Sequence, residues 1–260
     1  MTVAQTEKLA ILPSGRMVVM ISLEKATASA TPVEGVHFDG DNLEEFDFGE
    51  VEFRNCRFSN CRFDYATLNS VRFFGCMFDH CSFKETIFAN CVFIEGETGT
   101  QWRYCEISKA EFRKCNLGLN RFVGCEAYLT EFKECAGQGM KLDLNCQRKV
   151  RTQVIPGGVR FLRCKMQYTE FSPADYQESV FESCDLRDCS FAGARLNSAS
   201  FRGASLNNAD FSEAILDHAD LSHASFDELD FAGMASFRAL SVTRDQHEAI
   251  ATSFGLLTVD

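Results

Sequence analysis

Residues 51–93 read VEFRNCRFSNCRFDYATLNSVRFFGCMFDHCSFKETIFANCVF, and this stretch determines the fold. A bulky apolar residue recurs at every fifth position, and a mostly small residue stands two positions before it. With the segment just upstream included, the bulky positions are Phe38, Leu43, Phe48, Phe53, Phe58, Phe63, Leu68, Phe73, Phe78, Phe83, Phe88 and Phe93. A period of five fits neither an α-helix nor the alternation of a single strand. A sustained fixed period is typical of repeat architectures.

The five-residue spacing predicts a coil with four sides. Residues i and i−2 lie on the same side of an extended segment, so both can point inward while the other three face outward or turn a corner. Four such segments close a square coil, and stacked coils satisfy one another's backbone hydrogen-bonding groups at about 4.8 Å per coil. Phe53, Phe73 and Phe93 would then stack at a separation that favours ring pairs. We expect an all-β fold, a quadrilateral β-helix that forms one elongated domain.

The register breaks twice along the chain. The next bulky residue after Phe93 is Trp102, and the next after Leu142 is Phe161. Glycines and charged residues in both intervals predict surface loops at 94–101 and 143–160. The third run continues to Phe231. The three runs together predict about nine coils and a stack roughly 43 Å long at the usual strand spacing.

Both ends of the chain lack the repeat. Residues 1–32 contain two short apolar stretches around a Pro-Ser-Gly turn at 13–15, which fits a β-hairpin or a flexible tail, and the segment is expected to cap the first coil. At the other end, Thr243 and Gln246 fit a capping box, and Gly255 fits a helix stop. We therefore expect an N-terminal extension at 1–32, the β-helix at 33–237, and a helix followed by a strand at 238–260.

The cysteines follow the repeat. Twelve of the thirteen occupy the small inward position, and Cys146 is the exception. Spacings of five and ten do not match zinc-binding pairs, so we expect reduced, structural cysteines with neither metal nor disulfide. Inward burial is expected for all of them apart from Cys146. No apolar run approaches the length of a membrane span or a signal peptide's apolar core, and we expect a cytoplasmic protein.

Charge is unevenly distributed. The whole chain carries −11, which argues against a general nucleic-acid binder. By segment, the net charge is −7 over 1–100, +7 over 101–165 and −11 over 166–260. The five histidines are scattered, and no nucleophile, P-loop or dinucleotide motif occurs. A β-helix with a filled interior leaves no substrate cavity, so we expect neither an enzyme nor a cofactor.

Segments such as ADFSE at 209–213 and ADLSH at 219–223 resemble the pentapeptide-repeat family, whose fold is a right-handed quadrilateral β-helix. A short loop after Phe93, a longer loop about 45 residues later and a short C-terminal helix are similar to the Qnr-type quinolone-resistance proteins. The likeness covers roughly residues 34–260. It implies a homodimer joined through the C-terminal end. It also implies that the protein binds DNA gyrase or topoisomerase IV and protects it from fluoroquinolones, with the acidic rod acting as a mimic of duplex DNA.

The resemblance also assigns candidate residues. The partner-binding residues it implies, together with outward acids of the last run, are Glu95, Gly96, Glu97, Thr98, Gly99, Thr100, Gln101, Asn145, Gln147, Arg148, Lys149, Arg151, Pro156, Gly157, Asp210, Asp217, Asp220 and Asp227. The dimer residues are Ile250, Phe254, Leu256 and Leu257. The second loop is basic, which departs from an acidic mimic. There are two alternatives to drug protection: the chain is a generic interaction scaffold of the same fold, or it provides immunity against a gyrase-targeting peptide antibiotic.

Overall fold

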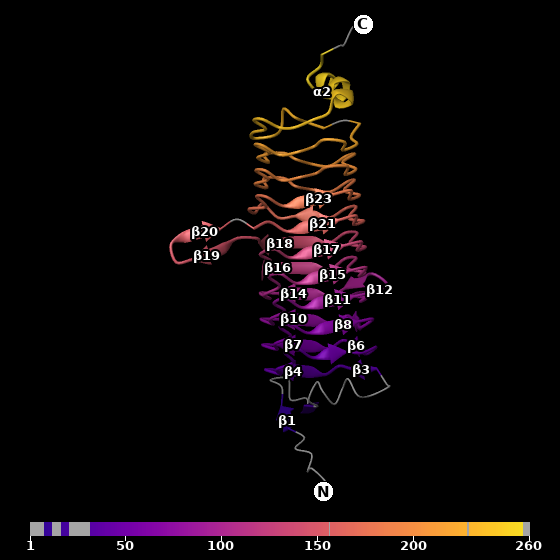
Figure 1. Cartoon of the computed structure of the whole chain (residues 1–260). Coiled ribbons are helices and arrows are strands. Elements are labelled where there is room, and N and C mark those ends of the chain that lie inside the picture. The colour runs from indigo at the N-terminus through magenta and orange to yellow at the C-terminus, as the bar shows by residue number, and fades with distance from the viewer. Residues whose placement is uncertain (1–7, 12–16, 21–31, 156, 228, 257–260) are drawn as a thin grey trace.

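The chain forms a four-sided parallel β-solenoid (Figure 1). The computed structural model describes all residues except 1–7, 12–16, 21–31, 156, 228 and 257–260. Following the chain through one coil, we number the sides face 1 to face 4. Face 1 contains β3 (Val33–Glu34), β6 (Glu52–Arg54) and β9 (Arg72–Phe74). Face 3 consists of isolated bridges such as Asn42↔Arg62 and Arg62↔Ser82.

Faces 2 and 4 are seven-stranded parallel sheets. Face 2 contains β4 (His37–Asp39), β7 (Arg57–Ser59), β10 (Met77–Asp79), β14 (Gln101–Arg103), β16 (Arg121–Glu126), β18 (Lys141–Asn145) and β22 (Glu170–Phe171). Face 4 contains β5 (Asp47–Phe48), β8 (Thr67–Asn69), β11 (Ile87–Ala89), β15 (Glu111–Arg113), β17 (Glu131–Lys133), β21 (Arg160–Leu162) and β23 (Val180–Glu182). Bridges from Val180 to Ser200, from Ser200 to Asp220 and from Asp220 to Ser241 continue face 4 beyond its seven strands to ten levels.

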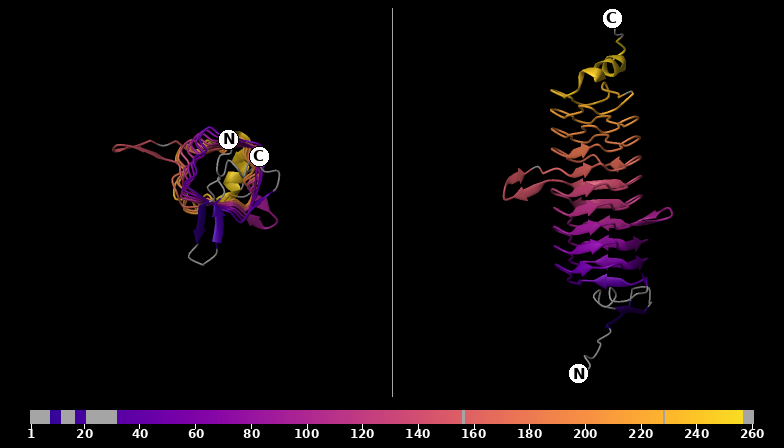
Figure 2. Two further views of the ribbon diagram at one scale, coloured as in Figure 1. Left: turned by 90° about the horizontal axis from the view of Figure 1, so that it is seen from below. Right: turned by 45° about the vertical axis from the view of Figure 1, so that its right-hand side comes forward.

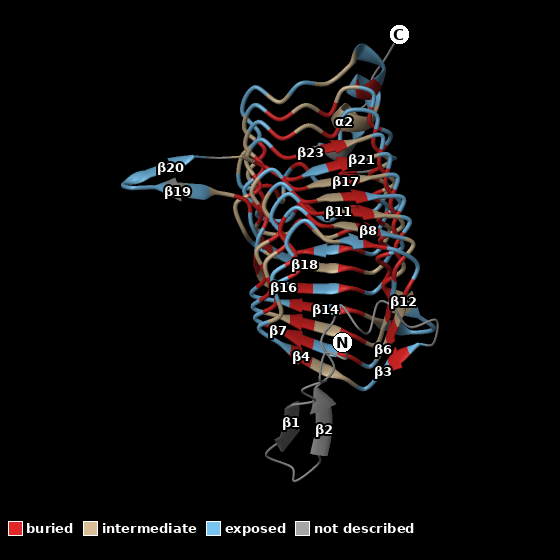
Figure 3. Cartoon of the chain, turned by 60° about the horizontal axis from the view of Figure 1, so that its bottom comes forward, coloured by how far each residue is buried: buried red, intermediate tan, exposed pale blue. Residues whose placement is uncertain are grey.

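The predicted register is confirmed, because equivalent residues of successive coils pair side by side. Phe58 pairs with Phe38 below and Phe78 above, and its ring centroid lies 5.0 and 4.9 Å from theirs. Phe53 and Phe73 stack at 5.3 Å with nearly parallel planes. All twelve bulky positions of the first run are buried (Figure 3). The interior is therefore a filled aromatic column, which gives the stack its rigidity.

The small inward position also donates hydrogen bonds. The thiol of Cys76 donates to the carbonyl oxygen of Phe53 at 3.4 Å, and the hydroxyl of Thr86 donates to that of Phe63 at 2.6 Å. Both acceptors belong to the coil below. Cys135 and Cys184 repeat the contact higher in the stack. Cysteine and threonine at this position are thus both small and able to donate a hydrogen bond. Cysteine therefore does more here than fill space as a small hydrophobic residue.

Cys146 corrects the sequence prediction, because it is buried like the other twelve cysteines, and all thirteen are free thiols. β16 and β18 pair with a register shift, so that Phe122 faces Leu142 while Cys125 faces Leu144. One coil is therefore one residue shorter at this point, and Cys146 follows Leu142 after four residues instead of five. Counting strictly by five placed it in the loop. Burial raises the pKa of the Cys146 thiol to about 12.

The C-terminal element closes the upper end of the stack. A 3₁₀ turn, η1 (Arg244–Gln246), leads into α2 (His247–Ser253), and the backbone N–H of Thr243 donates to the Gln246 side chain as the capping box predicts. The amide of buried Gln246 donates to the carbonyl oxygens of Leu221 and Ala224. The chain passes over Leu221 at Ser241 and reaches Gln246 just beyond this last bridge, so the Gln246 side chain supplies donors where the regular coil ends. Gly255 ends the helix with φ +70°.

At the lower end, β1 (Lys8–Ile11) and β2 (Met17–Met20) form the antiparallel hairpin that was one of the two expectations. The expected turn at 13–15 lies outside the described residues, and so does most of the segment expected to cap the first coil. The strand expected after α2 also falls mostly outside them. Within the described part of the chain, no helix is long and apolar enough for a membrane crossing.

Candidate partner-binding hairpins

The first loop is a short β-hairpin, which we call hairpin 1 (residues 94–99). β12 (Ile94–Glu95) and β13 (Thr98–Gly99) pair antiparallel across a two-residue turn. Gly96 occupies the first turn position with φ +57°, a conformation that glycine adopts readily in such turns. Glu95, Gly96, Glu97 and Thr98 are exposed. The predicted loop is thus an ordered projection.

Hairpin 1 is fixed to the stack at its base. Arg54 of β6 donates from one guanidinium nitrogen to both carboxylate oxygens of Glu95, each at 2.8 Å, and lies 4.9 Å from the centroid of the Phe74 ring. The hydrogen bonds to Glu95 raise the pKa of the Arg54 guanidinium. Gly99 lies so close to the next coil that a Cβ there would come within 2.4 Å of the Leu119 backbone. These contacts hold the hairpin in one orientation.

Thr100 does not belong to the exposed loop in which it was predicted. It is fully buried, and its hydroxyl donates to the carbonyl oxygens of Phe73 and Phe93 at 2.9 and 3.0 Å. It occupies the small inward position two residues before Trp102. Gln101 begins β14 and belongs to the stack as well. The part of the first loop that projects from the stack therefore ends at Gly99, although Gln101 is exposed on face 2.

The second loop holds a longer hairpin, which we call hairpin 2 (residues 148–155). β19 (Arg148–Val150) and β20 (Gln153–Ile155) pair antiparallel and project far from the stack (Figures 1 and 3). Its exposed residues include Arg148, Arg151, Val150, Val154 and Ile155. The predicted loop began too early, since residues 143–146 still belong to the stack: Asn145 ends β18, and buried Cys146 follows it.

The base of hairpin 2 lies against Tyr128. The Arg148 guanidinium is 5.9 Å from the centroid of the Tyr128 ring, and Gly157 lies so close to that ring that it leaves no room for a Cβ. Gln147 donates to Asp175 of the next coil. Sequence reasoning missed Tyr128, because it stands at an outward repeat position where periodicity sets no residue type. Of the other loop residues predicted to bind a partner, Pro156 lies outside the described part, as does the side chain of Lys149.

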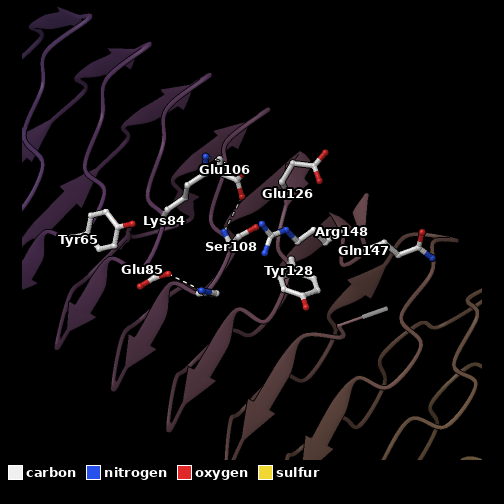
Figure 4. A pocket seen from close by; sticks show the side chains of 10 residues that line it. Tyr65, Lys84, Glu85, Glu106, Ser108, Glu126, Tyr128, Gln147 and Arg148 are labelled. Atoms are coloured by element: carbon white, nitrogen blue, oxygen red, sulfur yellow. Dashed lines mark hydrogen bonds and ion pairs between the residues drawn. The ribbon is translucent and has the colours of Figure 1, made fainter. Parts of the chain in front are cut away.

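A groove of about 390 Å³ opens beside this base along faces 3 and 4 (Figure 4). Tyr65 and Tyr128 line it together with three basic and three acidic side chains. Four of these charges form two ion pairs, because Lys109 donates to Glu85 at 2.8 Å and Lys84 lies 3.8 Å from Glu106. The lining carries no net formal charge. The groove extends the surface that a partner of hairpin 2 would cover.

The predicted acidic residues are outward but lie on different sides of the rod. Asp210 continues the ladder of face 2, whereas Asp220 continues that of face 4. Asp217 accepts from the Ser236 hydroxyl and the Arg238 backbone N–H, and these bonds hold the pKa of its carboxyl below the usual value. Asp227 accepts from Asn207 at 2.9 Å. The acids therefore surround the upper coils and form no single patch.

The predicted dimer residues fall into two groups. Phe254 and Leu256 are exposed beyond α2, at 46% and 60%, and Phe237 of the last coil is exposed nearby, with its ring 6.3 Å from that of Phe254. Ile250 instead packs against the core of its own chain. Leu257 lies outside the described residues. Among the described residues, the exposed apolar surface at this end thus consists of Phe237, Phe254 and Leu256.

Comparisons with known proteins agree with this geometry. Residues 158–231 match a family model described as a pentapeptide repeat region, and residues 37–73 match one for pentapeptide repeats. No curated protein matches the chain.

Solved structures share the fold. A trypsin-treated variant of QnrB1, a plasmid-mediated fluoroquinolone resistance protein, superimposes with a TM-score of 0.60 at 18% identity, covering 88% of this chain and 100% of that one. HetL, a pentapeptide-repeat protein involved in heterocyst differentiation regulation in the cyanobacterium Nostoc sp. strain PCC 7120, gives 0.64 at 16% identity, covering 81% of this chain and 86% of HetL. The five-residue register, the repeat matches towards both ends of the stack and the common solenoid together identify the chain as a pentapeptide-repeat protein.

Proposed function

We propose that the chain binds a type II topoisomerase, DNA gyrase or topoisomerase IV, and protects it from fluoroquinolones. The observation that carries this proposal is the pair of ordered hairpins inserted into a stack that closes without them. The N–H of Thr100 donates to the carbonyl oxygen of Phe93 across hairpin 1, just as the N–H of Thr86 donates to that of Phe83 at a corner without an insert. The corner is therefore complete in both cases. Residues that the fold does not require are the natural place for contacts with a partner.

The charge of the rod supports a DNA-like binding mode. Residues 166–260 carry −11, and their acids lie on several faces, so negative charge surrounds the upper coils as it surrounds a duplex. A cationic surface that normally holds DNA would attract such a rod over a distance of about 10 Å at moderate salt. The basic hairpin 2 departs from this pattern, so it requires a contact of its own.

The proposal includes a homodimer formed through the C-terminal end. The surface made of Phe237, Phe254 and Leu256 is apolar and exposed, and a two-fold contact would cover it in both copies. The acids of the upper coils point outward from the stack axis, so end-to-end contact leaves them in solvent. Two stacks would form a rod roughly 80–90 Å long.

A scaffold or regulatory protein of the same fold is the second candidate. HetL, which is involved in regulating differentiation, superimposes at least as well as QnrB1 does. At sequence identities of 16–18%, such a similarity indicates a shared fold and does not indicate a shared function. Immunity against a gyrase-targeting peptide antibiotic would use the same partner as drug protection. A direct assay must therefore separate a topoisomerase partner from any other.

The deciding experiment is DNA supercoiling by purified gyrase, with and without ciprofloxacin, over a titration of the full-length protein. We expect supercoiling to recover in the presence of the drug at protein concentrations that leave the drug-free reaction active. The same assay with a gyrase-targeting peptide antibiotic separates immunity from drug protection. The scaffold alternative would be established by three negative results together. The protein would fail to restore gyrase supercoiling, fail to restore decatenation by topoisomerase IV, and show no measurable binding to either enzyme.

A further inference from the structure

The two hairpins leave the stack from opposite corners. Hairpin 1 follows the face 1 bridge at Val92 and precedes β14 of face 2, so it stands at the corner between faces 1 and 2. Hairpin 2 follows Asn145, which continues the ladder of face 3, and precedes β21 of face 4. In a four-sided coil these corners are diagonal. The view along the stack in Figure 2 shows the two hairpins pointing away from each other.

Their heights along the stack differ only moderately. β14 directly follows hairpin 1, β18 directly precedes hairpin 2, and a single strand, β16, separates these two in the sheet of face 2. Two steps in the ladder correspond to about 10 Å. A flat partner surface that contacts one hairpin therefore leaves the other on the far side of the rod, at nearly the same height.

The chemistry of the two hairpins is also opposite. Hairpin 1 carries Glu95 and Glu97, and Arg54 already neutralises Glu95. Hairpin 2 exposes the cations Arg148 and Arg151 together with Val150, Val154 and Ile155. An isolated two-stranded hairpin is at best marginally stable in water, and its apolar side chains gain from burial against a partner. Hairpin 1 suits a basic surface, and hairpin 2 suits an acidic surface with an apolar centre.

We propose that the partner grips the rod from two sides, with a basic element at hairpin 1 and a separate acidic, partly apolar element at hairpin 2. This inference rests on the proposed function and makes it more specific: the topoisomerase would receive the rod in a channel or cleft between two of its segments. It also gives the basic hairpin 2 a role. By its length, hairpin 2 reaches past a cationic channel that attracts the acidic coils and contacts an acidic surface beyond it.

Site-directed crosslinking tests the two-sided grip. All thirteen native cysteines are buried, so a photoreactive thiol probe would attach selectively to Glu97→Cys or to Val154→Cys, both at exposed positions. Each labelled protein is irradiated in complex with the intact gyrase–DNA assembly, and the linked peptides are identified by mass spectrometry. We expect two different segments of the enzyme, a basic one from position 97 and an acidic one from position 154.

Two outcomes would overturn the inference while leaving the function intact: both probes reach one contiguous surface, or gyrase binds without linking to both sites. If the labelled proteins and the unmodified protein all fail to bind gyrase, the proposed function itself fails.

Charge reversal provides a second measurement. Arg151→Glu and Glu97→Arg should each weaken gyrase binding about tenfold or more at low salt, the loss that breaking one close charge pair produces. The matched controls are Arg202→Glu and Glu50→Arg, which make the same charge changes at exposed positions away from both hairpins. Equal losses in the controls, or none in the hairpin variants, would contradict opposite recognition at the two hairpins.

Discussion

The interior of the stack and the two hairpins follow different rules. Inside, a five-residue rule determines nearly every position, and each side chain is stabilised by the residues at equivalent positions in the coils above and below. In the hairpins no residue repeats, and their positions depend on single contacts such as that of Arg54 with Glu95. If the hairpins bind the partner as proposed, the chain separates stability from recognition along its sequence. Substitutions in the two regions should therefore affect different measurements.

Replacing Phe78 with Ala should produce the largest loss of stability, about 3–5 kcal/mol in the free energy of unfolding. Phe78 is fully buried, and its ring lies 4.9 Å from that of Phe58 and 4.5 Å from that of Trp102. Neighbouring coils cannot close the cavity, because their backbones are fixed by the ladder. Denaturant unfolding measures the loss, and Phe254→Ala at the half-exposed end is the control. A loss below 1 kcal/mol would refute the filled-column description.

Gln246→Leu should cost about 2 kcal/mol, because it removes two hydrogen bonds and leaves the carbonyl oxygen of Ala224 without this donor, whereas that of Leu221 still accepts from the Ala224 N–H. Gln246 is 6% exposed, and its amide contacts the oxygens of Leu221 and Ala224 at 2.8 and 2.7 Å. The upper coils should fray first, which hydrogen exchange of residues 200–240 would detect. His247→Ala, at the neighbouring exposed position, is the matched control. Equal exchange rates in the two variants would mean that the last coil needs no cap.

Thr86→Val should cost about 1 kcal/mol, the usual contribution of one hydrogen bond. The substitution nearly preserves side-chain volume and removes the hydroxyl that donates to Phe63. That carbonyl oxygen still accepts from the backbone of Ala66, so no buried group is left unpaired. Thr86→Cys should cost less than Thr86→Val, since a thiol donates at equivalent positions. Thermal unfolding of the three proteins tests this order. A reversed order would mean that small side-chain size alone explains why cysteine fills these columns.

Much of the fold was predictable because the repeat leaves little freedom. The inward residues, the two interruptions, the capping box and the stop at Gly255 all follow from the sequence. The predictions that were wrong concern places where the spacing between successive inward residues differs from five. Cys146 comes after a shortened coil, and Thr100 resumes the register before the loop appears to end. The hairpin anchors Arg54 and Tyr128 could not be found, because outward positions accept many residue types and their contacts depend on neighbouring coils.

Changing both Phe254 and Leu256 to Asp should leave the fold intact and remove the proposed dimer. Both side chains are largely exposed in the single chain, and Phe254 touches the core through its ring contact with Phe231, whereas a charge at Ile250 would disturb packing within the chain. Light scattering should report a dimer for the unaltered protein and a monomer for the double variant, with unchanged circular dichroism. A monomeric unaltered protein would remove the dimer from the proposal.

Deleting the hairpins should have the smallest effect on stability and a large effect on protection. Removal of residues 95–98 joins Ile94 to Gly99, and removal of residues 148–157 joins Gln147 to Gly158. Each deletion restores a five-residue step and keeps the inward Thr100 or Val159 in place. The exposed ion pair of Arg54 is lost, but such pairs contribute little. We expect unchanged circular dichroism, a melting temperature within a few degrees, and gyrase that ciprofloxacin inhibits again.

A second deletion of the same length shows whether the register or the inward residue matters. Removing residues 97–100 restores the same step but replaces Thr100 with Gly96 at the inward position. It removes the two hydrogen bonds to Phe73 and Phe93, so this variant should be less stable than the first by about 1–2 kcal/mol. Both should lose protection equally, because both lack hairpin 1. If protection instead follows the melting temperature across the three deletions, the hairpins act through the fold, and stability and recognition are not separate in this chain.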